Sequence, residues 1–142
     1  MTKSSIFSTP DYLGDVARFH RDVLQVLPDG GPTLVSQEYI MERARFLSEE
    51  VEEFITGGVS GNIVDVADAL ADIVYVALGT AHMMGLPFEK IWTAVQKANM
   101  AKKPGVTSRG NKVDAVKPPG WVGPEAEIAK AIEESIDDSP FT

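Results

Sequence analysis

Apolar residues recur every three to four positions along most of the chain, a spacing that predicts α-helices. The clearest stretch, residues 63–84, is apolar almost all round and is typical of a helix inside a protein. No stretch alternates apolar and polar residues with period two, so we expect no convincing β-strand. The expected helices span about residues 11–27, 36–55, 63–84, 88–101 and 124–137.

Proline and glycine mark the ends of these helices. Pro28-Asp-Gly-Gly-Pro32 ends the first, Gly57-Gly58 ends the second, and Gly85-Leu-Pro87 follows the third. The pattern predicts an all-α bundle of four to five helices in a single domain over residues 1–142. Its expected parts are a core at about 11–101, a long basic loop at 102–123 and a C-terminal helix at 124–137.

Composition narrows the class of protein. A chain of 142 residues with 44% hydrophobic content can bury a single core. A net charge of -8 argues against a nucleic-acid-binding protein, and the absence of cysteine excludes disulfides and thiolate metal sites. With no apolar run of 18 residues and no apolar N-terminal segment, we expect a soluble cytoplasmic protein without a membrane partner.

The helix expected at residues 63–84 carries a stripe of carboxylates. Asp65, Asp68 and Asp72 are spaced i, i+3 and i+7, which places them on one helix face. No Lys, Arg or Glu occurs in residues 66–84 to neutralise the stripe. Because burial of an unpaired carboxylate costs about several kcal/mol, the counter-charge must be a metal ion or basic residues from another segment.

Charges are segregated along the chain. Residues 49–72 hold seven acids and no base, whereas six of the chain's 13 Lys and Arg residues lie in 97–117 beside one acid, Asp114. Carboxylate oxygens suit Mg²⁺, and Lys and Arg suit phosphate oxygens, so the two segments together predict a polyphosphate site. The alternative for the glutamates, a solvated helix face, stays open. A di-iron bundle is excluded because neither histidine has Glu three residues before it.

Two segments, residues 43–54 and 68–81, resemble the MazG-like all-α nucleoside triphosphate pyrophosphohydrolases, relatives of phosphoribosyl-ATP pyrophosphohydrolase and of the dimeric dUTPases. The first reads Arg-Ala-Arg-Phe-Leu-Ser-Glu-Glu-Val-Glu-Glu-Phe and the second begins Asp-Ala-Leu-Ala-Asp. Asn99-Met-x-Lys102 and Lys117-Pro-Pro-Gly-Trp121 look most like the phage-type branch. The resemblance covers most of residues 16–125.

This resemblance implies hydrolysis of a nucleoside triphosphate to the monophosphate and pyrophosphate, with two or three Mg²⁺ or Mn²⁺ ions per site. The family pattern has Glu-x-x-Glu on one helix and Glu-x-x-Asp on the next. Ala69 stands where the pattern has its third Glu, and either Asp68 or Asp65 could fill that role. The implied metal ligands are Glu50, Glu53, Asp68 and Asp72.

Glu49 matches the acid that precedes the first motif, and it is our candidate base for activating water. The resemblance also implies a homo-oligomer, a dimer or a tetramer, with a nucleoside triphosphate as substrate and no nucleic-acid partner. Candidates for binding the substrate are Lys97, Asn99, Lys102, Arg109, Lys112 and Lys117.

The phage-type motifs further suggest the MazZ group, which converts dGTP to dGMP in phages that use 2-aminoadenine. We therefore expect dGTP, with GTP also accepted, and the host cytoplasm as location if a phage encodes the protein. Two alternatives stay open. One is a house-cleaning pyrophosphatase for dUTP or modified nucleotides, and the other is a helical oligomer that senses nucleotides without catalysis.

Overall fold

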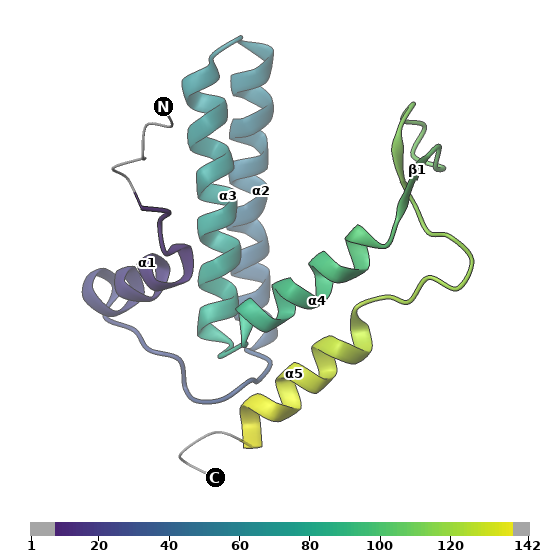
Figure 1. The fold of residues 1–142 in the computed structure, drawn as a ribbon. Helices are drawn as coiled ribbons and strands as arrows, with labels where there is room; N and C mark the ends of the chain where they lie inside the picture. Colours follow the sequence, from purple (N-terminus) through teal and green to yellow (C-terminus); the bar gives the residue numbers. More distant parts are fainter. Residues whose placement is uncertain (1–7, 138–142) are drawn as a thin grey trace, which may run out of the picture. The chain divides into compact units, whose positions relative to one another are not determined.

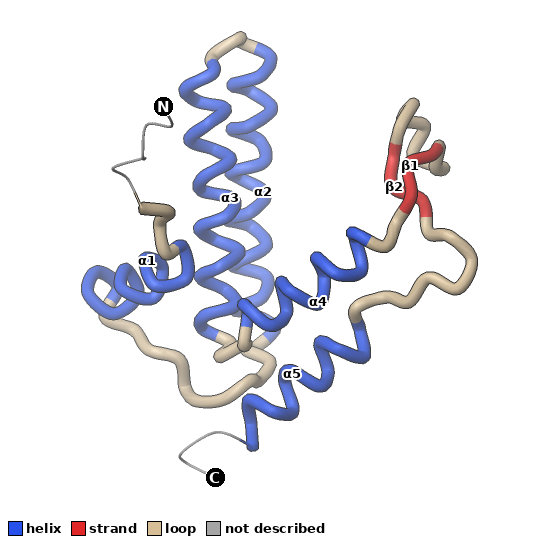
Figure 2. The backbone as a smooth tube through the Cα atoms, viewed as in Figure 1, coloured by secondary structure: helices blue, strands red, loops and turns tan. Residues whose placement is uncertain are grey.

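The computed structural model describes residues 8–137, and its fold is mostly helical (Figures 1 and 2). The prediction of an all-α class is confirmed. The chain forms two compact units that meet in the sequence at Gly85 and Leu86, and each is described separately. The single domain over residues 1–142 stays a prediction. None of the helices in residues 8–137 has the length and apolar character needed to cross a membrane.

The first helix, α1 (Tyr12–Phe19), continues directly into a short π-helix, η1 (His20–Leu24). Asp11 caps the start, because its side chain accepts a hydrogen bond from the Gly14 amide at 2.9 Å. We expected this helix to reach residue 27, and it is shorter. Gln25 takes the left-handed conformation with φ of 57°, which ends the helical hydrogen-bond pattern.

Two long helices, α2 (Gln37–Val59) and α3 (Ile63–Met83), lie side by side as a hairpin (Figure 1). Ser36 caps α2 and Asn62 caps α3 through side-chain oxygens that accept backbone N–H groups. The prediction that Gly57-Gly58 ends α2 is wrong, because the helix continues through both glycines. The sharp turn comes at Gly61 instead, where φ is +70°.

Four residues of α3 belong to the core of the first unit. Ala69, Leu78, Gly79 and Ala81 are buried. The prediction that this helix lies inside the protein is wrong for the single chain, because one face stays open to solvent. Leu70 is 48% exposed and Val74 is 50% exposed. The physical reason is that α2 and α1 do not surround α3 completely.

The second unit pairs helix α4 (Phe88–Met100) with helix α5 (Glu125–Asp137). Between them lie two short strands, β1 (Lys103–Gly105) and β2 (Asp114–Val116), which form an antiparallel hairpin (Figure 2). The prediction of a strandless loop at residues 102–123 is therefore wrong. Strands of three residues are too short to show an alternating pattern in the sequence.

Candidate metal centre

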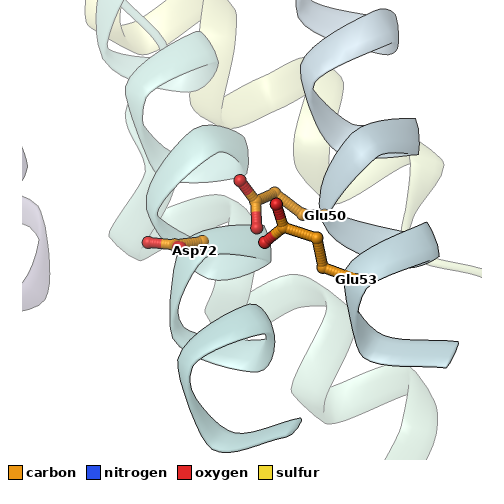
Figure 3. A group of neighbouring side chains, drawn as sticks. All are labelled: Glu50, Glu53 and Asp72. Atoms are coloured by element: carbon orange, nitrogen blue, oxygen red, sulfur yellow. The ribbon is translucent and has the colours of Figure 1, made fainter. Parts of the chain in front are cut away.

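Three carboxylates from α2 and α3 gather in the hairpin (Figure 3). Glu50 and Glu53 lie about one turn apart on the same side of α2, and Asp72 comes from α3. One oxygen from each of the three carboxylates lies within 4.8 Å of the others. The arrangement offers hard oxygen ligands to a single divalent cation.

Glu50 is the acid of this cluster that has a raised pKa and a buried oxygen without a hydrogen-bond partner. Its side chain is half-buried, and its Oε2 atom is buried without a hydrogen-bond partner in the described part of the chain. Burial raises the pKa of the Glu50 carboxyl, and the negative charges of Glu53 and Asp72 raise this pKa further. A cation would satisfy the unpartnered oxygen and offset the repulsion, so the residues fit the divalent metal that the sequence predicts.

The other predicted acids are less closely involved. Asp68 is exposed, and its charge contributes least to the raised pKa of Glu50. Asp65 lies farther along the hairpin, where a methyl group added at Gly57 would come within 3.1 Å of the Asp65 Cβ atom. Glu49 is exposed on α2 and does not belong to the three-carboxylate cluster. The roles of these three acids stay predictions.

Ala69 stands three residues before Asp72, at the position of the third glutamate in the family pattern. This residue is only 1% exposed and lies among the buried residues of α3. A glutamate at this position, as in the resembling family, would bring a further carboxylate into the packed part of the hairpin. The chain has instead a methyl group, which leaves the third position of that motif without a ligand.

Arg43 is a structural residue of the hairpin that the sequence reasoning missed. Its Nε donates to Thr80 Oγ1 at 2.9 Å, and its terminal nitrogen donates to the carbonyl oxygen of Val76 at 3.0 Å. Arg43 precedes Glu50 by seven residues, or about two helical turns. These bonds between α2 and α3 help to fix the position at which the carboxylates meet. The sequence offered one signal for this role, because Arg43 lies at helical spacing from the apolar residues Ile40 and Leu47.

The predicted substrate-binding residues lie in the second unit, and their surroundings differ. Lys97 pairs with Glu127 at 2.5 Å, and Arg109 donates from Nε to Asp114 at 2.8 Å. Asn99 and Lys112 are exposed. The ammonium groups of Lys102 and Lys117 lie over the Trp121 ring. All six residues have the same predicted role, and the pattern of charges along the chain does not reveal these partners.

Asp114 accepts hydrogen bonds from three neighbouring residues in the basic segment 102–123. Hydrogen bonds from the Thr107 hydroxyl, the Ala115 amide and Arg109 lower its carboxyl pKa to about 2. Arg109 therefore neutralises an acid of its own segment. In the same unit, a groove of about 490 Å³ between α4 and α5 is lined by Glu89, Ala94, Lys130 and neighbouring residues, and it contains none of the three carboxylates.

A helical hairpin that gathers carboxylates from both of its helices is an arrangement suited to a metal-dependent all-α enzyme. Residues 17–99 match the family model of phosphoribosyl-ATP pyrophosphohydrolase, and the chain belongs to this family. The matched segment includes all three carboxylates. Membership of this family supports a nucleotide pyrophosphohydrolase activity. Such an enzyme is a hydrolase that acts on acid anhydrides. No curated protein sequence matches the chain.

Proposed function

We propose that the protein is a metal-dependent pyrophosphohydrolase that converts a nucleoside triphosphate to its monophosphate and pyrophosphate. The observation that supports this proposal most directly is the meeting of Glu50, Glu53 and Asp72, with one Glu50 oxygen buried and unpartnered. Carboxylates placed in this way are retained at a cost to stability, which favours a chemical role over a structural one.

The proposed roles follow from the chemistry of each residue. Glu50, Glu53 and Asp72 would hold Mg²⁺ or Mn²⁺, with Asp68 as a further ligand. When bound, such an ion neutralises phosphate oxygens and lowers the pKa of water. Glu49, exposed beside Glu50, takes the proton from the attacking water.

In the reaction, the water oxygen forms a bond to phosphorus, and the bond between that phosphorus and the bridging oxygen of the leaving group breaks. The pyrophosphate and the monophosphate share the negative charge that develops. Lys97, Asn99, Lys102, Arg109, Lys112 and Lys117 are proposed to contact the substrate. Of these residues, Lys97 and Arg109 must exchange an existing acidic partner for phosphate.

For the base, we propose dGTP, with GTP also accepted. This part of the proposal rests on the likeness of Asn99-Met-x-Lys102 and Lys117-Pro-Pro-Gly-Trp121 to phage-type relatives. A guanine-selective pocket would pair the polar edge of the base. Each contact that a wrong base leaves unpaired would lower affinity by roughly 1 to 3 kcal/mol.

The deciding experiment measures pyrophosphate release from dGTP, GTP, dATP, dCTP and dUTP with Mg²⁺ and with Mn²⁺. We expect the highest kcat/KM for dGTP. A pyrimidine preference of about tenfold or more, equivalent to about 1.4 kcal/mol, would refute the guanine assignment and favour a house-cleaning role. No release from any nucleotide at high protein concentration would favour the non-catalytic sensor.

Variants test the metal centre in the same assay. Glu50→Gln, Glu53→Gln and Asp72→Asn should each abolish turnover, while Glu52→Gln, an exposed acid on the same helix, should not. Asp68→Asn and Asp65→Asn compare the two candidates for the missing ligand, and we expect the greater loss at Asp68. Near wild-type rates for Asp72→Asn would contradict the metal assignment.

A further inference from the structure

The strand register places two lysines opposite each other at the base of the β-hairpin. Lys103 pairs with Val116 in the antiparallel ladder, so Lys102 and Lys117 are opposite one step beyond this pair. Like charges in directly opposite positions repel. Among residues 8–137, neither lysine has a carboxylate within ion-pair distance. The hairpin therefore concentrates positive charge at this point without an acid to balance it.

Trp121 holds both ammonium groups. Lys117 Nζ lies 4.9 Å from the centre of the indole ring, and Lys102 Nζ lies 5.4 Å from it. An aromatic ring attracts a cation through its electron-rich face but cannot neutralise its charge. Two cations on one ring are thus kept in place while they remain free to bind an anion.

Trp121 is anchored at two points, one in its indole ring and one in its backbone. Its Nε1 donates to the carbonyl oxygen of Ala98 at 2.8 Å, in the last turn of α4. The Trp121 amide donates to Pro118 at 3.0 Å, which closes a tight turn with Gly120 at φ of +79°. The turn returns the chain toward Lys117, so hydrogen bonds hold both the ring and the backbone of Trp121.

The neighbouring basic residues lack this arrangement. Lys97 and Arg109 are already paired with acids, as described above. Lys103 is exposed, carries the same charge as Lys102 and lies next to it in the sequence, but it makes no contact with the Trp121 ring. The two lysines on the indole are therefore the best-prepared anion ligands among the basic candidates.

We infer that Lys102 and Lys117 form a phosphate-binding clamp that Trp121 positions, and that this clamp binds the pyrophosphate portion of substrate or product. This inference rests on the proposed function for the identity of the ligand. Trp121 acts here as a positioning residue, because it orders the two ammonium groups and need not touch the phosphate. The anchored ring keeps the lysines at the base of the hairpin before the anion arrives.

Intrinsic fluorescence tests the clamp, with inorganic pyrophosphate as the probe. The chain has two tryptophans, and Trp92→Phe leaves Trp121 as the reporter. Titration at low salt in EDTA should give a saturable change in Trp121 fluorescence. In the same background, Lys102→Gln and Lys117→Gln should each weaken binding by about fivefold, because each removes one charged contact. The matched control Lys103→Gln should change affinity by less than about twofold.

Calorimetry with pyrophosphate tests the positioning role of Trp121. We expect Trp121→Leu to weaken binding about as much as loss of one lysine, and Trp121→Phe to restore most of the affinity, because a ring is again present. Circular dichroism and thermal melting identify any variant that fails to fold. Equal losses in Lys103→Gln and Lys102→Gln, or no binding of pyrophosphate to the wild type, would overturn the inference.

The test of the clamp and the test of the hydrolase activity can fail independently of each other. Turnover of nucleotides with no pyrophosphate binding, or with no selective effect at Lys102 and Lys117, refutes the clamp alone. Selective pyrophosphate binding with no turnover of any nucleotide refutes the hydrolase proposal and retains the anion site. Use of EDTA makes the binding measurement independent of the three-carboxylate cluster.

Discussion

At the scale of single residues, Glu50 shows how function and stability oppose each other. Its carboxyl is half-buried next to two other acids, and its pKa lies above the ordinary value of 4.5. A carboxyl with a raised pKa in the folded state contributes fully to stability below the unfolded pKa. That contribution is lost as the pH rises through the folded pKa. At neutral pH the ionised Glu50 therefore destabilises the metal-free protein.

We predict that Glu50→Gln raises the Tm of the metal-free protein at pH 7.5, because an amide removes the charge and keeps the shape. Mn²⁺ should raise the Tm of the wild type and have little effect on Glu50→Gln. Differential scanning fluorimetry with and without Mn²⁺ measures both effects. Glu49→Gln should keep the Mn²⁺ response but lose turnover, and Glu52→Gln should keep both. A wild-type Tm that does not respond to Mn²⁺ would contradict the assignment.

A second residue-scale prediction concerns His82. Burial lowers its pKa below 6.5, and the neighbouring His20, whose ring centre is 5.3 Å away, lowers it further. The unfolded chain therefore binds more protons than the folded chain as the pH falls. The stability contribution of neutral His82 is complete above pH 6.5 and is lost as the pH falls through the folded pKa.

Urea unfolding at pH 7.5 and pH 5.5 measures this effect. We expect the unfolding midpoint to fall on acidification, and His82→Gln to reduce the fall because glutamine does not titrate. The charged group that α2 brings near the His20 ring is Arg43, because both side chains come within 3.0 Å of a Cβ atom added at Gly79. An equal fall in midpoint for the wild type and His82→Gln would show that other groups control the pH dependence.

At the scale of elements, the hairpin of α2 and α3 depends on how closely its helices approach. Gly57 is buried in α2, and a Cβ atom there would come within 3.1 Å of the Asp65 Cβ atom and the Val66 amide. Gly58, the next residue, has nothing within 4 Å of the same position. The two glycines thus share a helix but differ in their surroundings.

We predict opposite effects for Gly57→Ala and Gly58→Ala. Alanine favours a helix by about 1 kcal/mol over glycine, so Gly58→Ala should stabilise the protein by up to about that amount. Gly57→Ala should destabilise it by about 1 kcal/mol or more, because backbone and Cβ atoms of α3 must move. Thermal or chemical unfolding measures the change in stability of each variant. A gain in stability for Gly57→Ala equal to that of Gly58→Ala would show that the close approach does not matter.

At the scale of the whole molecule, the exposed apolar residues of α3 are the most important feature. Ile63 is 80% exposed and Val64 is 72% exposed, and Leu70 and Val74 add to the same helix. The most apolar helix of the single chain is thus widely exposed to water. This exposure favours association, because burial of apolar surface is the main driving force for oligomers.

We predict a homo-oligomer, a dimer or a tetramer, at micromolar concentration. Light scattering should give a mass that is a multiple of the 15.4 kDa of one chain. Leu70→Glu should dissociate the oligomer, because it would bury an unpaired carboxylate at the interface. Leu34→Glu, which changes an exposed residue outside the helices, should not. A monomer mass for the wild type would contradict the prediction.

The periodic pattern was sufficient to predict the helical class and the start and end of α3 and α4 to within one residue, because spacing and capping are local. The pattern did not predict the end of α2 or the two short strands. Gly57-Gly58 signals a helix end, yet α2 continues to Val59, with Gly57 packed closely against α3. Strands β1 and β2 depend on pairing with each other, which neither segment of three residues reveals by itself.

The kinds of group available for chemistry can be read from the sequence, namely acids at residues 49–72 and bases at 97–117. Which of these groups meet depends on how the chain folds. Glu50, Glu53 and Asp72 form a cluster because α2 and α3 pack as a hairpin, while Glu49 lies on an exposed face. Among the bases, pairing with acids occupies Lys97 and Arg109, and Trp121 holds Lys102 and Lys117. Such choices depend on distances in space, which residue spacing along the chain does not encode.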